Sequence, residues 1–123
     1  MLAHQPTEIK AKYFLSLQAK HPKIQFSTLV DNLDSLQLFS DLAAKENQEF
    51  SLWIDINNGM NRTGILPELA YSLYENFLGM NTLKFQGLQV YDGHIRPLNL
   101  EERVKKCNID FKAVEDLIQK IES

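Results

Sequence analysis

The chain has 123 residues, a length typical of one domain, and 44% of them are hydrophobic, as in ordinary soluble globular proteins. Its formal net charge of −3, with 13 basic residues that form no dense patch, argues against a nucleic-acid partner, and no apolar run approaches the roughly 20 residues of a membrane span. Because Cys107 is the only cysteine, no internal disulfide can form, and we expect a cytoplasmic location.

The first half of the chain predicts two helices and one or two strands. Met1–Gln5 is short and apolar and is compatible with a first strand. A helix follows Pro6 and must end before His21-Pro22, because the residue before proline avoids the α region. Ile24–Val30 is rich in β-branched and aromatic residues and predicts a strand, after which Asp31-Asn32 offers an N-cap for the next helix. The apolar stripes of these helices are Ile9, Tyr13, Phe14 and Leu17, then Leu33, Leu36, Phe39, Leu42 and Ala43.

The second half repeats the alternation of strand and helix. Phe50–Ile56 and Leu83–Tyr91 predict strands. Between them, a helix begins at Pro67 and ends near Gly79. Asn99 is the predicted cap of a last, long helix, with Glu102 three residues on, as in a capping box. The apolar stripe of that helix is Leu100, Val104, Cys107, Phe111, Val114, Leu117 and Ile121.

Regular alternation of strand and helix predicts an α/β fold with parallel strands and right-handed crossovers. Two architectures compete, a closed barrel and a doubly wound open sheet. An open sheet of this size usually carries a glycine-rich phosphate turn after its first strand, and none is present. We therefore expect a fragment of a (β/α) TIM barrel, with three to four parallel strands alternating with helices.

Polar residues collect directly after the carboxyl ends of the predicted strands, where barrel enzymes place their active sites. Asp31-Asn32 is explained equally well by helix capping. The segment Asp55–Gly64 (DINNGMNRTG) is more informative, because glycine and asparagine tolerate positive φ and bring backbone close to a ligand. Arg62 presents a planar fork of donors that suits a phenolate, carboxylate or phosphate oxygen. We expect Arg62, Tyr91 and His94 to converge on one rim.

At this point the residues resemble a known family. WIDINNGMNRTGI, followed by GLQVYDGHI, is similar to the D-threonine aldolase and D-serine dehydratase group, whose N-terminal domain is an alanine-racemase-like barrel that binds pyridoxal phosphate. The resemblance covers nearly the whole chain and implies that residues 1–123 are the middle of such a barrel domain. It implies a pyridoxal-phosphate-dependent lyase or racemase that acts on D-amino acids.

The resemblance assigns roles to six residues. Arg62 matches the arginine that reaches the 3′-oxygen of the cofactor, and His94 matches a histidine beside its pyridine ring. Tyr91 and Gln89 match strand-end positions that face cofactor or substrate. Asn57 and Asn61 are expected to shape the loop around Arg62. Asp55 stands where related alanine racemases carry a modified lysine that supports the arginine.

The resemblance also implies that important parts of the site lie outside these residues. The Schiff-base lysine of the family belongs to an earlier strand, the phosphate-binding loops to later strands, and the ligands of a divalent metal to a C-terminal domain. No lysine of this chain lies at the predicted rim, so we expect no catalysis by the chain alone.

Two other classes of function stay open from the sequence. One is a non-catalytic pyridoxal-phosphate-binding protein with a racemase-like barrel, and the other is a small α/β interaction protein. A downstream His-x-Cys or His-x-Asp motif would favour the enzyme. An open part of a barrel also leaves strand edges and an apolar inner face, so we expect a homo-oligomer.

Overall fold

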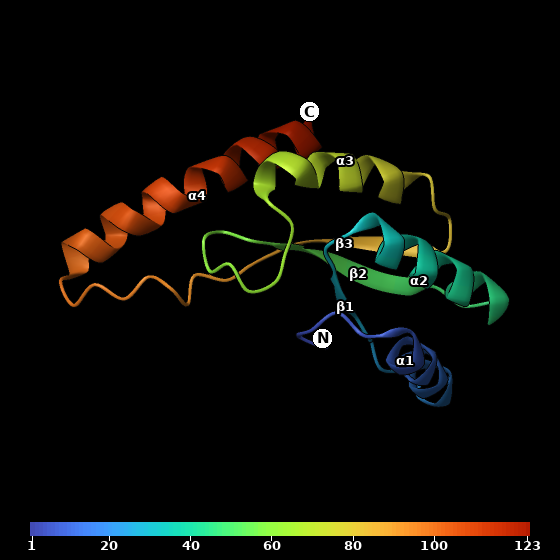
Figure 1. The fold of residues 1–123 in the computed structure, drawn as a ribbon. Helices are drawn as coiled ribbons and strands as arrows, with labels where there is room; N and C mark the ends of the chain where they lie inside the picture. Colours follow the sequence, from blue (N-terminus) through green and yellow to red (C-terminus); the bar gives the residue numbers. More distant parts are fainter.

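The computed structural model describes residues 1–123 as a three-stranded parallel sheet with four helices (Figure 1). The sheet order is β1-β2-β3, the order of the strands along the chain. The elements are α1 (Glu8–Lys20), β1 (Thr28–Val30), α2 (Leu33–Lys45), β2 (Phe50–Ile56), α3 (Pro67–Leu78), β3 (Leu83–Val90) and α4 (Leu100–Glu122). No helix is both long enough and apolar enough to cross a membrane.

The first strand was predicted too long, and a strand before it does not form. Met1–Gln5 is irregular, although Leu2 N–H donates to Ser27 O at 2.7 Å and holds this segment beside the start of β1. Only Thr28–Val30 of the predicted strand Ile24–Val30 pairs with β2. The sheet therefore has three strands, the lower bound of the prediction.

The helices begin and end close to the predicted positions, and two of them have the predicted side-chain caps. Asn32 accepts a hydrogen bond from Ser35 N–H at 2.8 Å and caps α2. Asn99 accepts from Glu101 and Glu102 N–H and caps α4. The predicted buried face of α1 is partly wrong, since Ile9 and Tyr13 are exposed and the helix buries Ala11, Phe14 and Leu15 instead.

One side of β2 supplies the centre of the core. Phe50, Leu52, Ile54 and Ile56 alternate along the strand, are buried, and face the helices. Phe50 packs between the rings of Phe14 and Phe39, with ring centroids 5.3 and 5.2 Å away.

The opposite side of β2 carries Ser51, Trp53 and Asp55, so it is mixed in polarity. The residues expected to form an apolar inner face do not do so together. Val30 and Leu83 are buried in the helical core and Phe26 and Phe85 pack against it, whereas Ile24 is 55% exposed and Thr28 is buried outside this cluster.

The pairing of β2 with β3 contains a register shift. Leu52 pairs with Phe85, but the next residue, Trp53, pairs with Gly87, so Gln86 is an extra residue in β3. Further along, Asp55 pairs with Gln89.

The amino-terminal half of α4 extends past the sheet, above the connection that follows β3 (Figure 1). Leu100 and Val104 of its predicted apolar stripe are 68% and 49% exposed, whereas Val114 and Leu117 are buried against the core. Only the carboxyl-terminal half of α4 therefore packs as predicted.

Candidate functional site

A cavity of about 280 Å³ lies at the carboxyl ends of the strands. Asp55 reaches it from the end of β2, and Gln89 from the paired position of β3. The N-terminal segment closes one side. The lining residues are Ala3, His4, Leu29, Asp55, Ile56, Asn57, Met60, Arg62, Thr63, Gln89 and Tyr91.

The loop after β2 is folded tightly by its own asparagines. Asn57 Oδ1 accepts hydrogen bonds from Gly59 N–H at 3.2 Å and Asn61 N–H at 3.0 Å, and Asn57 Nδ2 donates to Asn61 Oδ1 at 3.1 Å. Asn61 has φ of +54°, a conformation that asparagine tolerates better than most residues. The loop returns to the sheet where Ile65 N–H donates to Asp55 O at 2.9 Å. This geometry fixes the stem from which Arg62 projects.

Arg62 and Tyr91 meet across the mouth of the cavity. The guanidinium carbon of Arg62 lies 5.6 Å from the centroid of the Tyr91 ring, within cation–π range. The two residues belong to the loops after β2 and β3, so the sheet brings together side chains 29 positions apart. Both are exposed on their outer sides, which leaves donors of Arg62 free for a ligand oxygen.

Asp55 is a buried carboxyl on the cavity wall, 9% exposed. Burial raises the pKa of Asp55 above its ordinary value, and the nearby Asp31 raises it further. A hydrogen bond from Thr63 and the charge of Arg62 act in the opposite direction but do not cancel the effect of burial. The fold therefore disfavours the ionised form of this side chain.

Replacing Asp55 with asparagine is expected to raise the melting temperature by a few degrees at about pH 7. The folded chain holds a proton on Asp55 more strongly than the unfolded chain does, so ionisation costs stability as pH rises from 3.8 through the raised pKa. The neutral amide avoids this cost. At about pH 3 both states carry a neutral Asp55, and the gain should vanish. Melting curves at both pH values test this.

The exposed carboxyl Asp41 of α2 provides the matched control. Asp41→Asn is expected to leave the melting temperature nearly unchanged at either pH. An equal gain for Asp55→Asn at both pH values would rule out relief of a buried charge.

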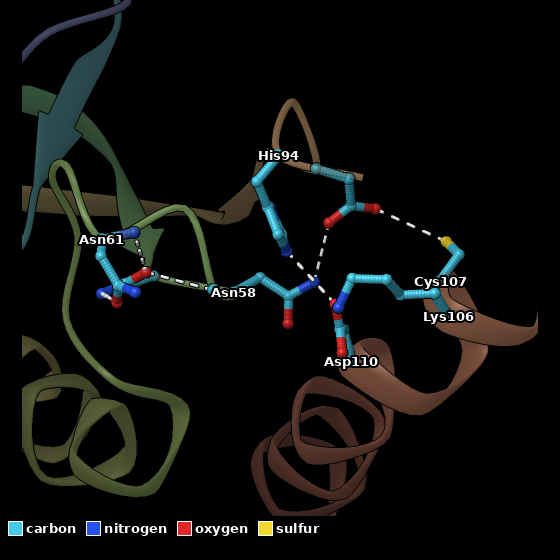
Figure 2. A network of polar contacts seen from close by, with 9 residues as sticks. Asn58, Asn61, His94, Lys106, Cys107 and Asp110 are labelled. Carbon is cyan, nitrogen blue, oxygen red and sulfur yellow. Dashed lines mark hydrogen bonds and ion pairs between the residues drawn. The ribbon is translucent and has the colours of Figure 1, made fainter. Parts of the chain in front are cut away.

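His94 lies outside this cavity, in a neighbouring hollow between the loop after β2 and α4 (Figure 2). Its Nε2 is 3.2 Å from Asp110 Oδ2, and its ring packs against Gly59. Its Nδ1 is buried without a hydrogen-bond partner. Lys106 donates to the same Asp110 oxygen at 3.0 Å, and these two hydrogen bonds lower the pKa of the Asp110 carboxyl.

The structure thus brings together four of the six predicted site residues. Asn57, Arg62, Gln89 and Tyr91 line the cavity. Asn61 supports the loop through Asn57 without lining the cavity. His94 shares the rim but faces α4, and its contact with a cofactor stays a prediction.

Several polar residues near the site make contacts that the sequence did not predict. Asn58 is 5% exposed and donates through Nδ2 to Asp92 Oδ1 at 2.7 Å. Asp31 accepts a hydrogen bond from Gly64 N–H at 3.0 Å, so it supports the loop after β2 in addition to preceding the cap of α2. His4 and Asp55 line the cavity, but the sequence assigned neither a binding role.

Comparison with known sequences identifies one family. The model of the family described as alanine racemase, N-terminal domain, matches residues 10–123. No curated protein matches the chain.

Comparison with solved structures finds the same architecture in larger enzymes. D-threonine aldolase from Filomicrobium marinum superposes with a TM-score of 0.79 and 22% sequence identity, covering 93% of this chain and 31% of the aldolase. Alanine racemase from Clostridium difficile 630 superposes with a TM-score of 0.70 and 15% identity, covering 95% of this chain and 29% of the racemase. The chain thus spans less than a third of the length of these two structures. The match confirms the predicted fold class, a portion of a (β/α) barrel.

Proposed function

We propose, on the premise that the chain belongs to the family of alanine racemase N-terminal domains, that its cavity forms part of a pyridoxal-phosphate site. The enzyme in question would act on D-amino acids as an aldolase, dehydratase or racemase. The observation that carries this proposal is the pairing of Arg62 with Tyr91 in a cavity at the carboxyl end of a parallel sheet.

The residues present fit the cofactor in chemical terms. Arg62 is a permanent cation with free donors, and it would hold the phenolic oxygen of the pyridine ring. Tyr91 and Gln89 would contact the cofactor or substrate from β3, and Asn57 would keep the Arg62 loop in place. When bound, pyridoxal phosphate withdraws electrons from the reacting carbon of an amino acid. The contribution of this chain is to position and polarise the ring.

We propose that the chain alone does not catalyse, and that it needs residues from elsewhere for turnover. No lysine is among the eleven residues that line the cavity, so the cavity supplies no covalent anchor. The second candidate, a pyridoxal-phosphate-binding protein without catalytic activity, would need the same lysine from elsewhere, so this observation does not separate the two. A divalent metal would need ligands from outside the chain. We also propose a cytoplasmic location, as expected from the single cysteine.

Arg62→Leu is expected to weaken binding of the cofactor ring by about tenfold or more, since a hydrogen bond to a charged group contributes about 1.5–3 kcal/mol. The probe is pyridoxine 5′-phosphate, which keeps the ring hydroxyl and the phosphate but has no aldehyde to react with surface lysines. Fluorescence of Trp53, the only tryptophan, reports the titration. Arg62→Lys should retain part of the affinity, because it keeps the charge and loses the planar fork.

Arg103→Leu is the matched control, because Arg103 lies exposed on α4, away from the cavity. It removes the same charge and should leave the affinity unchanged. Absence of saturable binding by the wild-type chain, or equal affinities for Arg62→Leu and wild type, would overturn the proposed function.

We also propose that the chain is a homo-oligomer through the open edge of β3. β3 is an edge strand, and an apolar groove of about 290 Å³ runs between it and α4. Edge strands present unpaired backbone groups that recruit another chain. A second copy of the chain would cover the side chains that line the groove, among them Phe85, Leu88, Val90, Phe111, Ile118 and Ile121.

A further inference from the structure

The loops that carry Arg62 and Tyr91 are joined by a hydrogen bond between two other side chains. Asn58 follows Asn57, the residue that organises the Arg62 loop, and Asp92 follows Tyr91 directly. Asn58 Nδ2 donates to Asp92 Oδ1 at 2.7 Å (Figure 2). Each partner therefore lies on a short, structured stretch of backbone that leads to one member of the Arg62–Tyr91 pair.

Because Asn58 is buried, its amide can be satisfied only by a matching hydrogen-bond partner. Asn58 is 5% exposed, so its amide has little access to water and depends on Asp92 as a partner. A side chain that no longer matched Asp92 would force the two loops apart, because a buried polar group without a partner is costly. The distance between the loops after β2 and β3 therefore depends on the hydrogen bond from Asn58 to Asp92.

Helix α4 holds the other side of the loop after β3. Asp92 Oδ2 accepts from the Cys107 thiol at 3.6 Å, and His94 contacts Asp110, which Lys106 also binds (Figure 2). Lys106, Cys107 and Asp110 lie within about one turn of α4. Asp92 therefore lies between Asn58 and α4, a helix anchored to the core by its carboxyl-terminal half, so a change in the contact between Asn58 and Asp92 is expected to displace the loop that carries Arg62.

We propose that Asn58 and Asp92 are positioning residues that set Arg62 against the ring of Tyr91 and so shape the cavity for its ligand. The inference rests on the proposed function for its purpose. The distance between Arg62 and Tyr91, however, can be measured without any cofactor.

The test measures the ring-current shift that the Tyr91 ring imposes on the side-chain protons of Arg62, by NMR of the ligand-free chain. Tyr91→Leu gives the reference value without the ring. Asn58→Asp faces Asp92 with a second carboxylate and is expected to remove most of the shift, because like charges in a buried contact repel. The double variant Asn58→Asp with Asp92→Asn reverses donor and acceptor and should restore it.

The same variants are then titrated with pyridoxine 5′-phosphate. Asn58→Asp should weaken binding roughly fivefold, within the range of substitutions that act on a site through its neighbours, and the reversed pair should recover most of the affinity. Asn81→Asp, an identical change at an exposed position before β3, is the matched control and should alter neither measurement. If Asn58→Asp does not fold, Asp92→Ala removes the acceptor without a repulsive charge and is expected to reduce the shift in the same direction.

The outcomes separate this inference from the proposed function. An unchanged Arg62 shift in folded Asn58→Asp or Asp92→Ala overturns the inference, whatever the ligand does. Failure of the reversed pair to restore the shift also overturns it, because a general loss of stability would then explain the single variant. If the wild-type chain does not bind pyridoxine 5′-phosphate, the proposed function fails, while the NMR result still decides whether Asn58 and Asp92 position the pair.

Discussion

Gly64→Ala is expected to destabilise the chain by about 3 kcal/mol, a large part of the stability of a single domain. Gly64 has φ of +99°, which L side chains rarely adopt, and an added Cβ would lie 2.6 Å from Asn57 N and 2.8 Å from the carbonyl carbon of Ile56. These neighbours are backbone atoms next to β2 and cannot rotate away. The substitution would also disturb the hydrogen bond from Gly64 N–H to Asp31. Denaturant unfolding measures the loss.

Gly79→Ala is the control for this prediction. Gly79 ends α3 at φ of −82°, and the nearest atom to an added Cβ is Asn76 O at 3.6 Å. Alanine is compatible with that conformation, so its effect should stay within about 1 kcal/mol and can be stabilising. Because Gly64 is two residues from Arg62, Gly64→Ala should also lose affinity for pyridoxine 5′-phosphate. Similar losses of stability at the two glycines would contradict the assigned loop geometry.

Ile121→Lys is expected to reduce the mass measured by light scattering roughly twofold, from a dimer to a monomer, since dimers are the commonest oligomers. Ile121 lines the apolar groove beside β3 and lies in the last turn of α4, where a cation suits the helix end. The charge would lie in the proposed interface, at a side chain that is only partly buried in the folded monomer. Leu98→Lys makes a similar change at a residue that is 98% exposed and outside the groove, and it should keep the wild-type mass. A wild-type chain that stays monomeric from micromolar to millimolar concentration would refute self-association.

The fold was predictable where local signals agree with each other. β2 has the predicted bounds, Phe50–Ile56, because its composition and its flanking polar segments indicate the same limits. α4 begins after Asn99 as predicted, since a cap is read from adjacent residues.

The errors occur where burial depends on distant parts of the chain. Ile9 is 80% exposed although its helical spacing indicated a core position, because α1 contacts the core with Ala11, Phe14 and Leu15. Spacing along a helix defines a stripe, but it does not reveal which neighbouring element will cover it.

The candidate site was predictable at the level of single residues but not of their contacts. Arg62 and Tyr91 were placed on one rim by the rule that parallel strands share their carboxyl ends, and the structure adds that they lie within cation–π range. The bond between Asn58 and Asp92 joins residues 34 positions apart, and the contact between His94 and Asp110 joins a loop to a helix. Neither pair has a spacing that predicts it.

The extra residue in β3, Gln86, changes which side chains of the strand face the helices. Before it, Leu83 and Phe85 face the helices, and after it Leu88 and Val90 do so. Phe85 and Leu88 are three positions apart, and in a strand without a bulge two such residues would face opposite sides. If β3 alternated regularly through Gln86, the polar side chain of Gln89 would point into the apolar helical layer, and Leu88 and Val90 would point into the cavity. Deletion of Gln86 would therefore remove the bulge and keep the chemistry of the two faces, because Gly87 would then follow Phe85 in regular alternation. The ligand-facing chemistry of β3 thus depends on a bulge in the backbone at Gln86, a residue that does not itself line the cavity.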